Sequence, residues 1–286
     1  MSALWEREDF RRVAQGAWRP GGTALTRRGL ALCRRHSDLT PGALVLDLGC
    51  GDGATLRLLL REGYRAWGLD RIAQPGAAAT GRLLLADAAR PPLAPGSLDA
   101  LLSECLLSLL PDPFAALRAW ARLLRPGGAL LVSDLTLAAP GARKRTSLPG
   151  CGCENAAASL EKSAVAAAAE AATGAEPTAP MATAPAARAT GAAAMPPAPA
   201  QDGCSAGAAR SCSAGARPAS VWQEMFVAAG LRVEICEDHS RTLAELAARL
   251  VWYGAAPADS CACNGSGPAA GSLGYNLWIA QKAPAA

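Results

Sequence analysis

The stretch Val45-Leu46-Asp47-Leu48-Gly49-Cys50-Gly51-Asp52-Gly53 decides the fold of this chain. Two apolar β-formers lead into an acidic residue and then into glycines at every second position, and an amphipathic segment over residues 54–61 follows at once. This order predicts a strand, a tight turn and the start of a helix. Because glycine has no Cβ and tolerates positive φ, such a turn lets the backbone approach a ligand closely.

The spacing of the glycines indicates which ligand the turn would bind. It is G-x-G-x-G, not the G-x-G-x-x-G of dinucleotide folds, where a pyrophosphate lies at the helix N-terminus. Asp47 and Asp52 would repel a pyrophosphate, whereas a carboxylate at the turn suits a ligand with an ammonium group, such as S-adenosylmethionine. A nucleotide-binding oxidoreductase is therefore the disfavoured alternative.

Four further segments continue this pattern in order along the chain. Each is a short apolar run that leads to an acid, and they are Trp67–Asp70, Leu83–Ala88, Ser97–Glu104 and Leu123–Asp134. Together with the glycine turn they resemble the class I S-adenosylmethionine-dependent methyltransferases, of the kind called type 11, and a bacterial subgroup of unassigned substrate. The resemblance covers residues 15–138 closely and residues 219–282 more loosely.

The resemblance implies S-adenosylmethionine as cofactor and assigns its contacts. Asp47, Gly49, Gly51 and Gly53 would form the turn on the methionine side. Asp70 would hold the ribose, since one carboxylate can accept bonds from both hydroxyls. Asp87 with Ala88 would face the adenine, and Glu104 could contact the amino-acid part.

The resemblance also implies an α/β fold with a doubly wound, Rossmann-like seven-stranded sheet, mostly parallel with an antiparallel last strand. We expect residues 1–40 to form a helical cap, residues 41–139 the cofactor-binding core, and residues 219–286 the C-terminal part of the same domain. In that last part we expect two helices and two strands, over Val221–Ala229, Thr242–Tyr253, Leu231–Asp238 and Tyr275–Ala280. One face of the second helix would carry Leu243, Leu246, Leu250 and Val251.

Residues 140–218 read as an insertion after the fifth strand. The segment is rich in Ala, Gly and Pro and has no aromatic residue, so it can bury little beyond methyl groups and cannot easily offset its own ordering entropy. We expect it to be largely flexible, with an alanine-rich helix possible over residues 154–172.

Methyl transfer requires mainly that nucleophile and methyl group be aligned in a water-poor site. Two side chains at predicted strand ends are candidates for the chemistry. Glu104 could position a substrate amine, or it could be a solvated loop acid. His239 could act as a general base. Alternatively, the run that contains His239 only caps the next helix, with Asp238 or Ser240 as the N-cap residue. The segment Trp18–Thr23 could close over the cofactor, or be a plain turn.

The ten cysteines allow a second interpretation. Thiolates bind soft metals and trivalent arsenic, and arsenite methyltransferases share this fold. The candidate thiols are Cys105, Cys151, Cys153, Cys261 and Cys263, with Cys204 and Cys212 in the insertion. None has the C-x₂-C spacing usual at zinc sites, and incidental thiols are the plainer interpretation, so we assign no metal site. Cys33, Cys50 and Cys236 are expected to pack in the core.

The charge balance is mild, with 28 basic against 24 acidic residues, and does not favour a nucleic-acid partner. The arginines that cluster before residue 40 are best read as a helix surface. No apolar run predicts a membrane span, and the acids near the start do not fit a signal peptide, so we expect a cytoplasmic protein. The predicted function is methyl transfer to a small molecule. The alternatives are an arsenite or metalloid methyltransferase, and a non-catalytic protein that presents a cysteine-rich arm to a metal or a partner. The oligomeric state stays open.

Overall fold

The computed structural model describes residues 7–14, 16–137, 212–253 and 273–284, and all of them belong to the unit that comprises residues 1–142 and 205–286. Its strands are β1 Leu44–Leu48, β2 Arg65–Asp70, β3 Leu83–Leu85, β4 Leu98–Glu104, β5 Leu124–Leu137, β6 Arg217–Pro218, β7 Leu231–Asp238 and β8 Leu273–Lys282. Its helices are α1 Glu8–Ala14, α2 Gly22–His36, α3 Ala54–Arg61, α4 Pro75–Ala78, α5 Pro113–Leu123, α7 Ala219–Ala228 and α8 Ser240–Trp252. Two 3₁₀ turns are η2 Leu107–Leu109 and η3 Cys212–Gly215.

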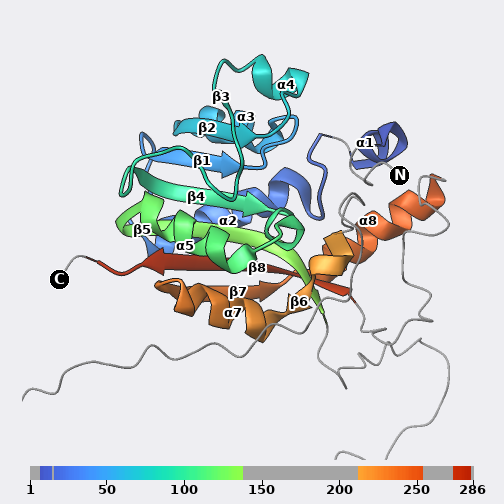
Figure 1. Ribbon diagram of the computed structural model, residues 1–286. Helices are drawn as coiled ribbons and strands as arrows, with labels where there is room; N and C mark the ends of the chain where they lie inside the picture. The colour runs from blue at the N-terminus through green and yellow to red at the C-terminus, as the bar shows by residue number, and fades with distance from the viewer. Residues whose placement is uncertain (1–6, 15, 138–211, 254–272, 285–286) are drawn as a thin grey trace, which may run out of the picture. The chain divides into compact units, whose positions relative to one another are not determined.

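The strands form one sheet in the order β3-β2-β1-β4-β5-β8-β7, and β6 pairs with β5 off this path (Figure 1). The first five strands of this order are parallel, whereas β8 runs antiparallel to both β5 and β7. The predicted fold class, a mostly parallel doubly wound sheet with an antiparallel last strand, is confirmed.

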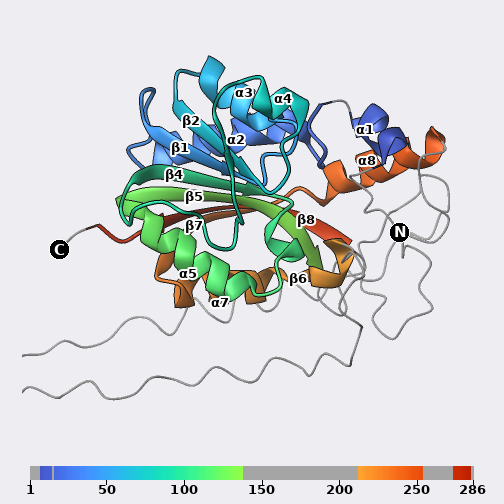
Figure 2. The ribbon, with the colours of Figure 1, turned by 45° about the horizontal axis from the view of Figure 1, so that its top comes forward.

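Helices cover both faces of the sheet, with α2 and α3 on one side and α5 and α7 on the other (Figure 2). The α5 side packs around three fully buried tryptophans, Trp120, Trp222 and Trp278. The sequence defines where α5 begins, because Asp112 accepts a hydrogen bond from the Ala115 amide at 2.9 Å and Pro113 follows at the first helical position. Because β1, β2 and β4 are parallel, their carboxyl ends lie at the same edge of the sheet.

At that edge α1 and α8 pack against each other through Phe10, Val13 and Leu250. Leu250 is buried as predicted, but Val251 is 67% exposed, so its expected place on the apolar face was wrong. The last residues of α8, Val251 and Trp252, are therefore exposed to solvent.

Two other expectations differ from the structure. Within the described residues, regular structure is present before the expected start at Ser220, since η3 begins at Cys212 and β6 extends the edge of β5 through the pair Thr136–Arg217. Cys236 is exposed, not in the core, because its strand alternates and this position faces outward. The remaining part of the predicted insertion lies outside the described residues. None of the described helices is both long and apolar enough to span a membrane.

Candidate cofactor site and active site

The glycine turn lies between β1 and α3. Gly49, Gly51 and Gly53 have φ values of 63°, 52° and 79°, which favour glycine. A Cβ on Gly53 would also lie 2.9 Å from the Cα atom of Ala77. Both the backbone angle and the space therefore require glycine at this position.

Asp70, at the end of β2, is bound to this turn. Its Oδ2 accepts a hydrogen bond from the Gly51 amide at 2.9 Å, and its Oδ1 accepts one from the Ile72 amide at 3.1 Å. The structure thus brings the predicted ribose acid next to the predicted methionine turn. Asp52 balances its charge locally, since it forms an ion pair with Arg57 at 3.2 Å.

Asp87 and Ala88 follow β3 in a turn. β3 ends at Leu85, two residues earlier than Asp87, which is exposed and accepts a hydrogen bond from the Ala89 amide at 2.9 Å. The carbonyl of buried Ala88 accepts a bond from Trp120 Nε1 at 2.7 Å. The core tryptophan therefore fixes the turn that carries the predicted adenine contacts.

Glu104, at the end of β4, is buried in a polar cluster and is not a solvated loop acid. Its Oε2 lies 2.7 Å from Arg19 Nη2 and accepts a bond from Thr55 Oγ1 at 2.8 Å. Its Oε1 accepts a bond from Thr26 Oγ1 at 2.9 Å. Arg19 also donates to both threonines. A buried ion pair with this many hydrogen bonds holds its members in one arrangement.

Two buried atoms in this cluster have no hydrogen-bond partner among the described residues. They are Asp47 Oδ2, an acceptor, and Arg19 Nε, a donor. Burial raises the pKa of Asp47 well above its ordinary value; the charge of Glu104 raises it further and that of Arg19 opposes this. Because unsatisfied buried polar atoms are costly, this donor and acceptor fit a ligand with both an ammonium and a carboxylate group.

The loop between α1 and α2 covers the glycine turn. A Cβ on Gly51 would lie 3.6 Å from the ring of Trp18, and the guanidinium carbon of Arg11 lies over that ring, 4.2 Å from its centroid. The expectation that Trp18 and Arg19 lie over the cofactor turn agrees with this geometry. Reading Arg19 as part of an arginine-rich surface was wrong, because its side chain is only 8% exposed.

Cys105 directly follows Glu104 and has a positive φ of 53°. Among the described residues it is the one non-glycine residue with a positive φ. Its Sγ lies 3.1 Å from Tyr275 Oη, which donates to Ser133 Oγ at 3.0 Å. Burial, and then the neighbouring Cys105, raise the pKa of Tyr275 well above its ordinary value. Sequence reasoning identified Cys105 but missed Tyr275, Thr26 and Thr55, which are far from it along the chain.

His239 lies between β7 and α8, directly before the first helical residue Ser240. Its amide donates to the Tyr275 carbonyl at 2.7 Å, and its Nε2 lies 3.1 Å from Glu237, which also binds Arg28. Asp238 Oδ1 accepts from the Ser240 amide at 2.8 Å, but the N-cap position is His239 and its side chain makes no capping bond, so the expectation that Asp238 or Ser240 is the N-cap was wrong. A catalytic role for His239 stays a prediction.

The other cysteines are of two kinds. Cys33 and Cys50 are buried as expected, and burial raises the pKa of Cys33 to about 12, so both are inert thiols. Cys151, Cys153, Cys204, Cys261 and Cys263 lie outside the described residues. Within the described ranges there is no group of three His, Cys, Asp or Glu that could hold a metal ion.

Comparison with known proteins agrees with this architecture. Residues 46–132 match the family model described as a methyltransferase domain. The ubiquinone biosynthesis O-methyltransferase of Xylella fastidiosa strain M23 is 33% identical over 47% of this chain and 61% of its own length. The enzyme of that name from Sodalis glossinidius is 35% identical over 33% and 42%. An arsenite methyltransferase of Aquipseudomonas alcaligenes is 34% identical over 34% of each chain. The chain thus spans between 34% and 61% of the length of these curated relatives.

Solved structures share the fold at low identity. Phosphoethanolamine N-methyltransferase 2 of Haemonchus contortus, in complex with S-adenosylmethionine, has a TM-score of 0.55 and 15% identity, covering 96% of this chain and 56% of that one. The cyclase SpnF has a TM-score of 0.53 and 20% identity, covering 95% and 84%. The fold, the glycine turn and the methyltransferase-domain match over residues 46–132 agree with the expected similarity to the class I S-adenosylmethionine-dependent methyltransferases. The name of the cyclase shows that the fold alone does not fix a reaction.

Proposed function

We propose that this protein transfers a methyl group from S-adenosylmethionine to a small-molecule acceptor. The observation that carries the proposal is the unpartnered pair of buried atoms, Asp47 Oδ2 and Arg19 Nε, beside the glycine turn. Asp47 would accept from the ammonium of the cofactor and Arg19 would donate to its carboxylate. Asp70 would hold the ribose hydroxyls, and Asp87 with Ala88 the adenine edge.

S-adenosylmethionine supplies a methyl group that its sulfonium already activates. The chain's own residues must therefore mainly orient and desolvate, and such positioning can contribute about 7–11 kcal/mol. Glu104 would act here as a positioning residue, because both of its oxygens are bound to Arg19, Thr26 and Thr55. Trp18 would exclude water from the turn.

The acceptor would lie near the end of β4, where Cys105 and Tyr275 adjoin the cofactor cluster. His239 is held by its backbone to Tyr275 and could accept a proton from the acceptor as it is methylated. Because relatives are named ubiquinone biosynthesis O-methyltransferases, phenols and catechols are the first acceptors to try.

Arsenite is the second candidate acceptor. It is favoured by the arsenite methyltransferase relative and by the thiol of Cys105, which lies at the end of β4 beside Tyr275. Thiolates bind trivalent arsenic well, and an acceptor of this kind would make Cys105 a catalytic residue.

The test combines cofactor binding with turnover. S-adenosylhomocysteine should bind the intact chain, and Asp70→Ala should weaken binding at least about tenfold, while the exposed-loop control Asp38→Asn should not change it. S-adenosylhomocysteine release would then be measured anaerobically with phenols, with catechols, and with arsenite plus glutathione. Release that requires arsenite and is lost in Cys105→Ser would establish the metalloid acceptor. A chain that does not bind S-adenosylhomocysteine would refute the proposal altogether.

A further inference from the structure

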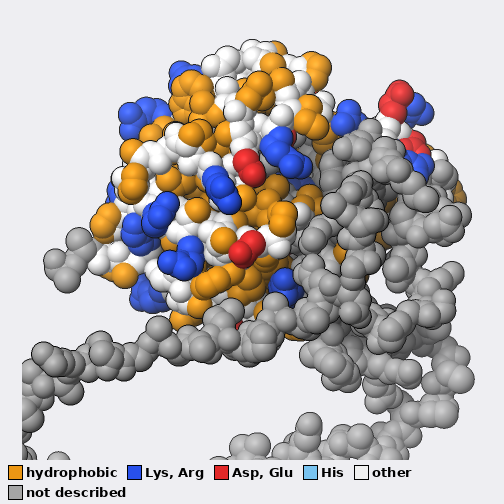
Figure 3. Space-filling model, viewed as in Figure 1, with side chains coloured by type: hydrophobic (Ala, Val, Ile, Leu, Met, Phe, Trp, Pro, Cys, Tyr) orange, Lys and Arg blue, Asp and Glu red, His pale blue; other side chains and the backbone are white. Residues whose placement is uncertain are grey.

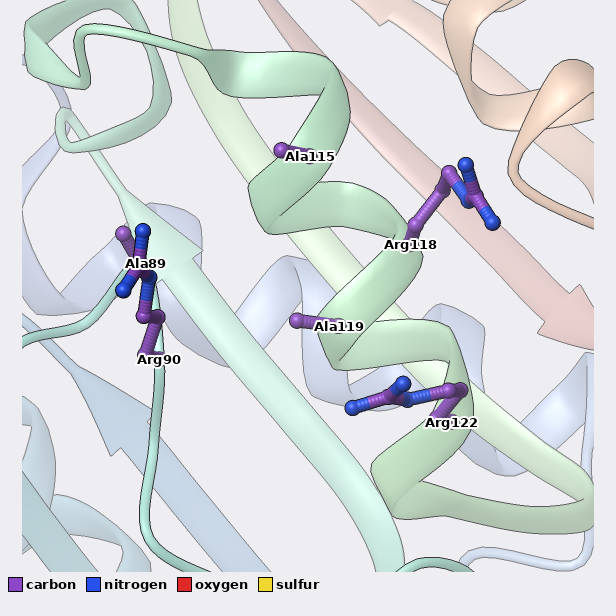
Figure 4. Close-up of a pocket in the computed structure, with 6 residues that line it drawn as sticks. All are labelled: Ala89, Arg90, Ala115, Arg118, Ala119 and Arg122. Atoms are coloured by element: carbon purple, nitrogen blue, oxygen red, sulfur yellow. The ribbon is translucent and has the colours of Figure 1, made fainter.

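The outer face of α5 carries two adjacent grooves, away from the glycine turn. The first has a volume of about 330 Å³ and is lined by Ala89, Arg90, Ala115, Arg118, Ala119 and Arg122 (Figure 4). The second, of about 250 Å³, is lined by Arg118, Ala121, Arg122, Ala229, Gly230 and Lys282. Because Arg118 and Arg122 line both, the two grooves form one surface from the loop after β3 to the turn before β7. We call this surface the α5 groove.

The charge of the α5 groove is not balanced within the described part of the chain. Arg90, Arg118 and Arg122 are exposed and have no acidic partner among the described residues, whereas Arg28, Arg34 and Arg125 each pair with a carboxylate. Arg118 and Arg122 lie one helical turn apart, so they repel each other. No acidic residue lines either groove. Lys and Arg side chains gather on this face of the molecule (Figure 3).

The floor of the α5 groove is made of small residues. Ala115 and Ala119 point from α5 toward the loop that carries Arg90, and Arg118 turns to the opposite side (Figure 4). Alanine side chains allow the backbone of a partner to approach closely, while the arginines on both sides present planar groups that bind carboxylates in two-point contacts.

We propose that the α5 groove is a docking surface for an acidic helix of a protein partner. Carboxylates three or four residues apart on such a helix would meet Arg90, Arg118 and Arg122 in turn, and Lys282 would extend the row. A single phosphate would use only part of this row, since the cations are distributed over two grooves.

The lining favours a protein over two other polyanions. Single-stranded nucleic acid binds where aromatic side chains stack on its bases, and no aromatic residue lines either groove. A membrane surface would be bound by large apolar side chains beside the cations, but the grooves contain only alanine and glycine between them. The exposed aromatic residues Trp252 and Tyr253 lie on or directly after α8 instead.

The test uses the intact chain and a defined acidic helix. The probe is a fluorescein-labelled alanine-based peptide of about 20 residues, long enough to be helical, with Glu at every third or fourth position of one face. Its control has Gln at those positions. The double variant Arg118→Glu/Arg122→Glu is matched by Arg35→Glu/Arg61→Glu, two exposed helix arginines elsewhere. Melting temperature and S-adenosylhomocysteine affinity serve as checks that each variant is folded.

We expect binding in the micromolar range that weakens with salt, as for a small charged interface. Arg118→Glu/Arg122→Glu should weaken it about tenfold or more, while Arg35→Glu/Arg61→Glu should leave it within twofold. Equal binding of the Gln peptide, or equal losses in both double variants, would overturn the proposal. So would tighter binding of phosphatidylserine vesicles or of a single-stranded oligodeoxyadenylate than of the Glu peptide.

Discussion

Asp47 at the end of β1 and Asp134 near the end of β5 are both buried aspartates, yet their surroundings differ. Asp134 accepts hydrogen bonds from Ser108 Oγ at 2.6 Å, from the Ser108 amide at 3.0 Å and from the Leu135 amide at 2.7 Å. Asp47 Oδ2 accepts none from the described residues. Burial raises the pKa of both. At Asp134 the hydroxyl and amide of Ser108 and neighbouring backbone amides oppose the rise, whereas at Asp47 the charge of Glu104 adds to it and is opposed by Arg19 and by the Leu56 amide.

This difference separates a structural carboxylate from a binding one. Asp134 fixes η2 on the end of β5, so its bonds are satisfied whether or not a ligand is present. Asp47 lies beside the ion pair of Arg19 and Glu104 with one oxygen free, which is unfavourable in the protein alone. Between these two aspartates, the unpaired oxygen of Asp47, and not burial or a raised pKa, distinguishes the candidate ligand contact.

The largest expected effect is a difference in stability between two single variants, Asp134→Asn and Asp47→Asn. In Asp134→Asn the NH₂ group of the new side chain faces a hydrogen-bond donor. A buried backbone N–H of Ser108 or Leu135 then loses its acceptor, and the free energy of unfolding should fall by about 2–3 kcal/mol. Asp47→Asn loses no bond at Oδ2 and removes a buried charge, so stability should be unchanged or higher. Urea unfolding of the two variants measures both. Equal losses in both variants would mean that Asp47 is also structural.

Affinity should show the opposite order. Asp47→Asn should weaken S-adenosylhomocysteine binding at least about tenfold, or about 1.4 kcal/mol, because an amide cannot attract the ammonium group as a carboxylate does. Asp134→Asn should change the affinity less than threefold when titration calorimetry is done well below its melting temperature. A stronger effect at Asp134 would place the ligand at the end of β5 instead.

The pH dependence of stability sharpens the comparison further. Because the pKa of Asp47 is raised in the folded state, the folded chain holds this proton more tightly than the unfolded chain does. Its contribution therefore favours folding below the ordinary value of about 4 and is lost as pH rises above that value. Asp47→Asn should gain stability over the unchanged chain progressively from about pH 4 upward. Parallel stability curves for the two proteins would contradict the raised pKa.

The sequence alone was enough to predict most of the fold and to select the residues of the glycine turn as the candidate cofactor site. Glycines at every second position and an acid after each apolar run are local patterns, so the turn, Asp47 and Asp70 could be found from them. The partners of Glu104 could not be found in this way. Thr26 is 78 residues and Thr55 49 residues from Glu104 along the chain, and no periodicity connects them. The contact between Tyr275 and Cys105 could not be predicted either. The two residues are 170 positions apart along the chain, and the antiparallel pairing of β8 with β5 brings them together.

The smallest effect concerns Cys105, which links the two regions because its amide donates to the Ser133 carbonyl beside Asp134. At φ 53° an alanine keeps the unfavourable backbone angle, whereas glycine adopts it freely. Cys105→Gly should therefore be about 1 kcal/mol more stable than Cys105→Ala, the reverse of the order at an ordinary helix or strand position. Both variants lose the contact with Tyr275 Oη, so their difference isolates the backbone contribution, and chemical denaturation measures it. If alanine is the more stable of the two, the positive φ at Cys105 does not strain the end of β4.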